Sequence, residues 1–141
     1  MTGILSNIQV IELTHGASGS FCAKLLADQG ADTIKVEPPG WGDTARHEPP
    51  FVNGTPDFDG SSTFLAFNTN KKGVTLDVTQ TEGRKLFLNL LQSTDVMIES
   101  SPPGTLDKLA LGYDELAVDN PKLILASLTY FGQTGPKSSY N

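Results

Sequence analysis

The stretch ELTHGASGSFCAKLLADQGADTIKVE, residues 12–37, decides the fold class of this chain. It reads as the end of a strand, a glycine-rich turn, a helix from Ser18 and a second strand that closes on an acidic residue. One face of the predicted helix is apolar and consists of Phe21, Cys22, Leu25 and Leu26. Gly30 stands where a helix C-cap glycine belongs. Because a dinucleotide-binding fingerprint has the same layout, the first question is whether this turn holds a pyrophosphate.

Strands and helices also alternate along the rest of the chain. Strand-like runs lie at 8–13, 73–78, 95–100 and 122–128. Helical patterns cover about 80–93, with an apolar face of Leu86, Phe87, Leu90 and Leu91, and 106–116. This alternation predicts an α/β domain with a Rossmann-like, mostly parallel sheet and flanking helices. Ligands of such sheets bind at the carboxyl ends of the strands, so the candidate site comprises 14–20, 38–46, 100–104 and 129–136.

Two features are unusual for a complete domain. The segment 38–63 contains five prolines and four glycines, and a structureless stretch of that length is uncommon unless it is functional or packs on a partner. Asp43 and Asp57 in it are expected to be solvated or to cap turns. The chain also stops just after the fifth predicted strand, although a parallel sheet needs both faces covered. We therefore expect a fragment, or a chain that another chain completes.

Composition excludes several classes of function. The net charge of −6 and the pI of about 4.7 leave no basic face for nucleic acid. No run approaches the length needed to span a membrane, and no secretory signal is visible. The single cysteine, Cys22, fits a buried position and a reducing cytoplasm. With one cysteine and two histidines, His15 and His47, we expect no metal site.

The turn departs from the dinucleotide pattern. It reads Gly16-x-x-Gly19 rather than G-x-G-x-x-G, with bulky residues at the start of the helix, and two prolines follow Glu37. A tight strand-to-helix connection is therefore favoured over a nicotinamide site. The turn can still serve an anion if Ser18 or Ser20 caps the helix and its amide hydrogens are free.

Four segments in order resemble one enzyme family. They are LLADQGADTIKVE (25–37), FNTNKKGVTLDV (67–78), TEGRKLFLNLLQSTDVMIES (81–100) and PGTLDKLALGYDELAVDNPKLILASLTYFGQTGP (103–136). They are similar to the family III CoA-transferases, which include the formyl-CoA and carnitine-CoA transferases and the α-methylacyl-CoA racemases. The chain is identified as the N-terminal part, 1–141, of the large CoA-binding α/β domain.

The resemblance implies an enzyme that moves CoA between carboxylic acids through an aspartyl anhydride and an aspartyl thioester. Its substrates are acyl-CoA and a carboxylic acid, and no cofactor is tightly bound. The family fold has two domains, and two chains interlock as a homodimer. The family's aspartate follows the GQTGP-like loop, beyond Asn141. The resemblance therefore places no catalytic residue in this chain and implies that the chain alone is inactive.

The resemblance also assigns binding residues. The turn residues that would border the thioester and pantetheine are His15, Gly16, Ala17 and Ser18. Those that would contact the nucleotide end are Phe67, Asn68 and Lys71, with Lys71 as a phosphate partner. Lys108 matches a basic position that helps to hold phosphate, and the active-site loop would contain Tyr130, Phe131 and Gly132.

The chain departs from the family at two CoA-binding stretches. Pro38 replaces an arginine that contacts a CoA phosphate, and Ser100, Ser101 and Pro102 replace an Asn-Phe-Arg run. The loss of two charge-assisted contacts, at about 1.5–3 kcal/mol each, implies either compensation by groups such as Arg46 or weak CoA binding.

Three alternatives remain at this stage. An α-methylacyl-CoA racemase would need a histidine near the thioester, for which His15 is the candidate, together with an aspartate as acid and base. A non-catalytic subunit would pair with a second polypeptide that carries the aspartate. A nicotinamide-binding module is the least favoured alternative, because the turn departs from the dinucleotide pattern.

Overall fold

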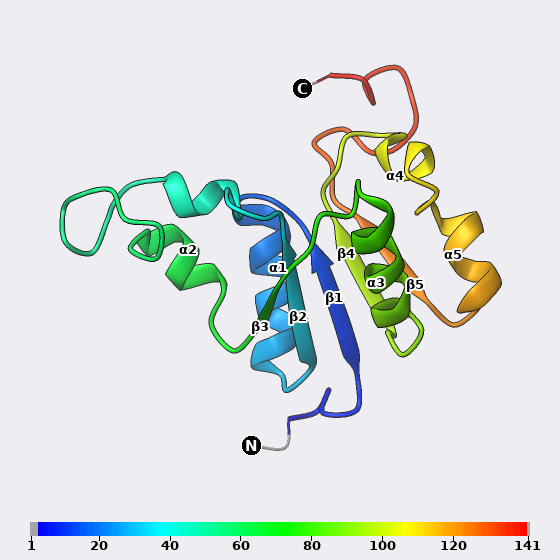
Figure 1. The fold of residues 1–141 in the computed structure, drawn as a ribbon, viewed down its shortest axis with the longest axis horizontal. Helices are drawn as coiled ribbons and strands as arrows, with labels where there is room; N and C mark the ends of the chain where they lie inside the picture. Colours follow the sequence, from blue (N-terminus) through cyan, green and yellow to red (C-terminus); the bar gives the residue numbers. More distant parts are fainter. Residues whose placement is uncertain (1–2, 141) are drawn as a thin grey trace.

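The computed structural model describes residues 3–140, and its centre is a five-stranded, all-parallel sheet in the order β3-β2-β1-β4-β5 (Figure 1). The strands are β1 (Gln9–Leu13), β2 (Asp32–Glu37), β3 (Lys72–Thr75), β4 (Val96–Glu99) and β5 (Ile124–Ser127). Each predicted strand is present, within a few residues of its predicted ends. The predicted α/β class with a Rossmann-like sheet is confirmed.

The strand order reverses direction at β1. The chain begins in the middle of the sheet, moves outward through β2 and β3, and returns to the other side of β1 as β4. The connections that leave β1 and β4 therefore diverge, and open α/β sheets bind their ligands in the crevice between two such connections. The topology places this crevice beside the turn after β1 and the segment after β4.

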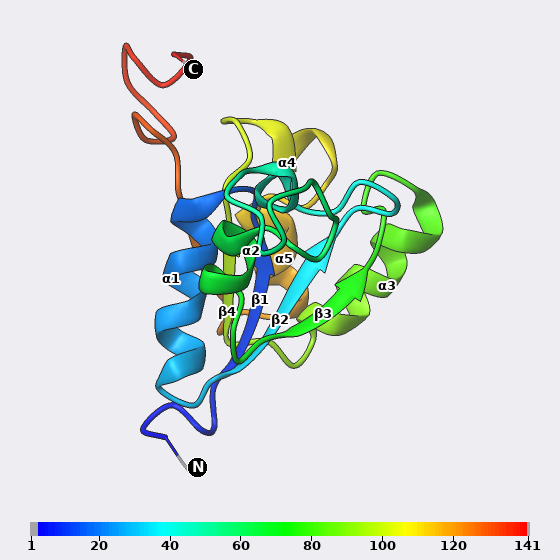
Figure 2. The ribbon, with the colours of Figure 1, turned by 90° about the vertical axis from the view of Figure 1, so that its left-hand side faces the viewer.

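Helices cover both faces of the sheet. Helix α1 (Ala17–Asp28) lies on one face, and α3 (Thr81–Leu91) lies on the opposite face (Figure 2). The face of α3 also carries α4 (Thr105–Lys108) and α5 (Tyr113–Asp119). Neighbouring residues of β1 point into different cores, since Val10 packs with the α1 side and Ile11 with the α3 side. The central strands β1, β2 and β4 are thus mostly buried on both faces, as parallel sheets require, whereas the edge strands β3 and β5 are exposed or only partly buried. In the described part of the chain, no helix is long and apolar enough to cross a membrane.

Helix α1 packs through small residues rather than through its large apolar ones. Its buried residues are Gly19, Ser20, Ala23 and Ala27. The predicted apolar face is therefore wrong in part, because Phe21 and Leu25 are about half exposed, while Cys22 and Leu26 are only partly buried against the core. In α3, Leu86 is likewise exposed. Gly30 has φ +99° and ends α1 as predicted.

Gly19 marks the closest approach of α1 to the sheet. A Cβ atom on Gly19 would lie 2.5 Å from the Cβ of Thr14. We expect Gly19→Ala to destabilise the natural protein by about 1–3 kcal/mol through overpacking, despite a gain of about 1 kcal/mol in helix propensity. Urea unfolding measures this change. The control is Gly73→Ala, where a Cβ meets nothing within 4 Å, and equal effects of the two substitutions would contradict the packing argument.

The segment 38–63, for which the sequence pattern predicts no helix or strand, contains short elements held by contacts with its own chain. A functional role or packing on a partner stays a prediction. The segment contains a 3₁₀ turn, η1 (Thr44–His47), and leads into α2 (Ser62–Phe67). Asp43 caps η1 by accepting the Ala45 N–H at 2.8 Å, and Ser61 caps α2. The Arg46 guanidinium lies over two aromatic rings of the same region, those of Phe58 and Phe64.

Candidate functional site

A cavity of about 420 Å³ opens at the carboxyl ends of β1, β4 and β5. The turn after β1 contributes His15 and Ser18, and the segment after β4 contributes Ser100, Pro102 and Pro103. The remaining lining residues come from the end of β5 and the tail beyond it: Ser127, Leu128, Thr129, Tyr130, Phe131, Ser138 and Tyr140. The cavity therefore lies where the strand order reverses, which is the expected ligand site of this fold.

The lining is rich in hydroxyl groups and apolar surface. Among the described lining residues there is no Asp, Glu, Lys or Arg. The Thr129 hydroxyl is buried and has no hydrogen-bond partner among the described residues. His15, which is exposed, is the one imidazole in this lining. Such a surface suits a mostly neutral ligand with amide or carbonyl groups.

The turn between β1 and α1 is held by two side chains from distant segments. The His15 N–H donates to Ser100 Oγ at 3.0 Å, and the Gly16 N–H donates to Asp43 Oδ1 at 2.8 Å. The helix N-cap is Gly16, with φ +73° and no side-chain cap. The expectation that Ser18 or Ser20 caps α1 is therefore wrong, and the first two turn amides already have acceptors of the protein's own.

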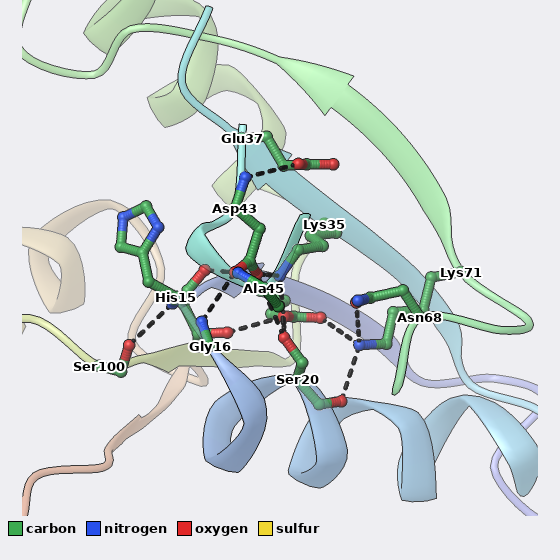
Figure 3. A network of polar contacts seen from close by, with 12 residues as sticks. His15, Gly16, Ser20, Lys35, Glu37, Asp43, Ala45, Asn68, Lys71 and Ser100 are labelled. Atoms are coloured by element: carbon green, nitrogen blue, oxygen red, sulfur yellow. Dashed lines mark hydrogen bonds and ion pairs between the residues drawn. The ribbon is translucent and has the colours of Figure 1, made fainter. Parts of the chain in front are cut away.

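Beside this turn lies a buried network of charged groups, drawn in Figure 3. The fully buried Glu12 carboxylate contacts Lys35 Nζ at 2.5 Å and Lys71 Nζ at 2.6 Å. It also accepts hydrogen bonds from the hydroxyls of Thr14 and Ser20, at 2.7 and 3.0 Å. Glu12 and Lys35 are paired in register on neighbouring strands, which explains how the sheet brings them together.

A second buried carboxylate completes the network. Asp43 Oδ2 lies 2.6 Å from Lys35 Nζ, and both side chains are almost completely buried. The two carboxylates and the two ammonium groups therefore give the network a net charge of zero. Burial by itself raises the pKa of both acids, but Lys35 and Lys71 outweigh it for Glu12, and Lys35 and backbone N–H groups outweigh it for Asp43. Both pKa values lie below their ordinary values, so both carboxylates stay charged at neutral pH.

These shifts predict a loss of stability in acid. The ordinary pKa values are 4.5 for Glu12 and 3.8 for Asp43, and the folded state lowers both. The stabilisation is therefore complete above the unfolded pKa values and is lost as the pH falls through the lower folded values. We expect the urea concentration at the unfolding midpoint of the natural protein to decrease when the pH is lowered below about 4. The decrease should be smaller in Glu12→Gln. A midpoint that stays constant or rises on acidification would contradict this.

A bidentate ion pair lies on the outer side of the network. Arg46 Nε and Nη2 donate to the Glu37 carboxylate at 2.6 and 2.9 Å, and the Asp43 N–H donates to Glu37 Oε2. Arg46 Nη1 also pairs with Asp59. Glu37 is thus engaged and does not face a ribose. Compensation by Arg46 for the missing arginines would require these pairs to break.

The structure separates the predicted binding residues into two groups. His15, Ser18, Tyr130 and Phe131 line the cavity, and Gly132 follows them in a turn with φ +80°. Gly16 and Ala17 form the start of α1 beside it. Their contact with CoA stays a prediction.

The second group lies away from the cavity. The Phe67 ring packs edge-on against Phe21, and Asn68 Oδ1 accepts a hydrogen bond from Lys71 Nζ at 2.9 Å. Lys71 also donates to Glu12 and to the Ser20 carbonyl, so its ammonium is fully used inside the fold. Lys108 is exposed at the end of α4. A phosphate role for Lys71 or Lys108 stays a prediction.

Sequence reasoning missed the Glu12–Lys35–Asp43 network. A signal was present, because Glu12 and Lys35 are each flanked by two apolar residues in neighbouring strands of the predicted parallel sheet. Charges buried on both sides must be paired. Of the cavity residues after β5, Thr129 lies in the predicted segment 129–136, whereas Ser138 and Tyr140 lie beyond it and had no such signal.

Comparison with known proteins identifies the family. The model of CoA-transferase family III matches residues 5–141. An acetyl-CoA:oxalate CoA-transferase of Acetobacter aceti is 41% identical over 138 residues, which are 98% of this chain and 34% of that protein. A succinyl-CoA:mesaconate CoA-transferase of Haloarcula hispanica is 40% identical over 130 residues, or 92% of this chain and 33% of that protein.

A solved structure agrees with these relatives. The crystal structure of a CAIB/BAIF family protein from Brucella suis superimposes with a TM-score of 0.89 at 39% identity, covering 99% of this chain and 37% of that one. The chain spans about a third of the length of these proteins. With its matched fold and sequence, the chain belongs to CoA-transferase family III.

Proposed function

We propose that this chain is the N-terminal part of the large domain of an acyl-CoA transferase, which moves CoA between carboxylic acids. The cavity at the crossover of β1 and β4 carries the proposal, since it would receive the thioester and pantetheine of CoA. The proposal includes an interlocked homodimer in the cytoplasm and a catalytic aspartate outside residues 1–141.

The composition of the cavity supports this division of roles. Its exposed hydroxyl groups and the His15 ring can bind amide and carbonyl groups. The described lining residues include no carboxylate, so a carboxylate nucleophile would come from another part of the natural protein.

The proposed chemistry is a sequence of balanced acyl transfers. The aspartate attacks the thioester carbonyl, CoA leaves as a thiolate, and a mixed anhydride forms. The thiolate then attacks the aspartyl carbonyl, which releases the first acid and leaves an aspartyl-CoA thioester. The acceptor carboxylate and the thiolate repeat these steps in reverse order to give the new acyl-CoA. Covalent catalysis of this kind divides one difficult exchange into easier steps.

The two histidines of the chain provide a matched test. His15 lines the cavity, whereas His47 lies outside it, stacked on Trp41. The natural protein is assayed with acetyl-, formyl- and succinyl-CoA as donors and with oxalate and mesaconate as acceptors. We expect His15→Ala to raise KM for the acyl-CoA about tenfold or more, and His47→Ala to change it less than about threefold.

Three results would contradict the proposal. One is the absence of both CoA binding and CoA transfer in the natural protein. Another is an equal effect of the two histidine substitutions. The third is deuterium incorporation at the α-carbon of a 2-methylacyl-CoA without CoA transfer, which would favour the racemase, the alternative supported by the position of His15 in the cavity.

A further inference from the structure

We infer that Asp43 is a positioning residue, whose buried carboxylate fixes the His15–Gly16 turn at the edge of the cavity. The inference rests on the proposed CoA site. It adds a residue that does not line the cavity and that belongs to a different segment of the chain.

The Asp43 carboxylate joins three parts of the fold. Oδ1 accepts the Gly16 N–H and the Ala45 N–H, each at 2.8 Å. Oδ2 lies 2.6 Å from Lys35 Nζ on β2. One fully buried side chain therefore ties the β1–α1 turn to η1 and to the sheet, as Figure 3 shows.

The turn has few other restraints. Gly16 adopts φ +73° and ψ −160°, and α1 has no side-chain cap at its N-terminus. The neighbouring His15 N–H is held from the opposite connection by Ser100 Oγ. The consecutive N–H groups of His15 and Gly16 therefore donate hydrogen bonds to two different segments of the chain. His15 itself lines the cavity.

The Asp43 carboxylate also determines whether the N-terminus of α1 can bind a ligand phosphate. A helix N-terminus commonly binds a ligand phosphate, but here the protein's own carboxylate takes the Gly16 N–H. Lys35 neutralises that carboxylate, and Glu12 and Lys71 form the second balanced pair. The turn is therefore used to place His15 beside a ligand rather than to hold an anion.

The test compares two double variants of the natural protein, Lys35→Met/Asp43→Asn and Lys35→Met/Asp43→Ala. Each removes one buried ammonium and one buried carboxylate, so Glu12 and Lys71 remain paired and the charge stays balanced. They differ in the side-chain oxygen, since asparagine keeps an acceptor for the Gly16 and Ala45 N–H groups and alanine does not. Glu48→Ala, an exposed position in the same segment, is the control.

The readouts are the affinity for free coenzyme A by calorimetry, hydrogen exchange of peptides covering 13–20, and thermal unfolding. We expect the asparagine variant and Glu48→Ala to bind within about threefold of the wild type, and the alanine variant to bind about tenfold more weakly. Exchange in 13–20 should be faster in the alanine variant only. The alanine variant should also unfold at a lower temperature, because two buried N–H groups lose their acceptor. Affinity and exchange are therefore measured at a temperature at which both double variants are fully folded, which separates positioning from general stability.

Equal CoA affinities of the two double variants would overturn the inference, as would weaker binding that disappears at temperatures at which the alanine variant is fully folded. Rapid exchange of the His15 and Gly16 amides in the wild type would overturn it without any variant. Failure of the proposed function looks different, because the wild type would then bind no CoA at all.

Discussion

Replacing Lys35 with methionine is expected to lower the free energy of unfolding of the natural protein by about 3–5 kcal/mol. The Lys35 ammonium is the shared partner of two buried carboxylates, at 2.5 Å from Glu12 and 2.6 Å from Asp43. Without it, Lys71 faces Glu12 while Asp43 keeps a buried charge with no cation. Methionine fills a similar volume, so the loss reports the charge rather than a cavity.

The matched control is Lys72→Met. Lys72 pairs with Asp32, but both side chains are largely exposed, at 68% and 46%. Exposed pairs contribute about 0–1 kcal/mol, so this substitution should have little effect. Urea unfolding followed by circular dichroism measures both variants at pH 7. Similar losses for the two lysines would show that the buried network does not hold β1, β2 and the 38–47 segment together.

Replacing Phe87 with alanine is expected to cost a similar amount, about 3–5 kcal/mol. The Phe87 ring is fully buried between α3 and the sheet, in the core that contains Ile11, Val36 and Met97. The truncation removes buried apolar area and leaves a cavity, which neighbouring side chains fill only in part.

Leu86, the preceding residue, provides the comparison. The sequence pattern places both residues on the apolar face of α3, but Leu86 is 53% exposed. Leu86→Ala should therefore cost less than about 1 kcal/mol. Calorimetric unfolding of the two variants measures the difference, and a loss in Leu86→Ala as large as in Phe87→Ala would mean that another part of the natural protein covers this face.

The β1–α1 turn shows how one fold can serve different chemistry. The sheet order and the position of the turn are those of a dinucleotide-binding domain. The Gly16 N–H nevertheless donates a hydrogen bond to the Asp43 carboxylate, and the Glu37 carboxylate forms an ion pair with Arg46. The two groups that would contact a pyrophosphate or a ribose are thus already paired with side chains of the same chain. The residues of the site, rather than the fold, therefore decide the function.

The sequence by itself determined the order of the secondary structure. The strands, the main helices and Gly30 as the end of α1 follow from local spacing, because side-chain period and glycine conformation depend on near neighbours. The candidate turn at His15–Ser18 and the loop at Tyr130–Phe131 followed from one further rule, that ligands bind at the carboxyl ends of parallel strands.

Only the tertiary structure decided which side chains meet. Gly19 and Ala23 face the sheet, in place of the larger Phe21 and Leu25, because close contact with β1 leaves room for small residues alone. Lys71 pairs with Glu12, 59 residues away in sequence, a contact that no local pattern around Lys71 predicts. Such pairings depend on which strands become neighbours and on the charge balance of a buried space, and local sequence patterns carry neither.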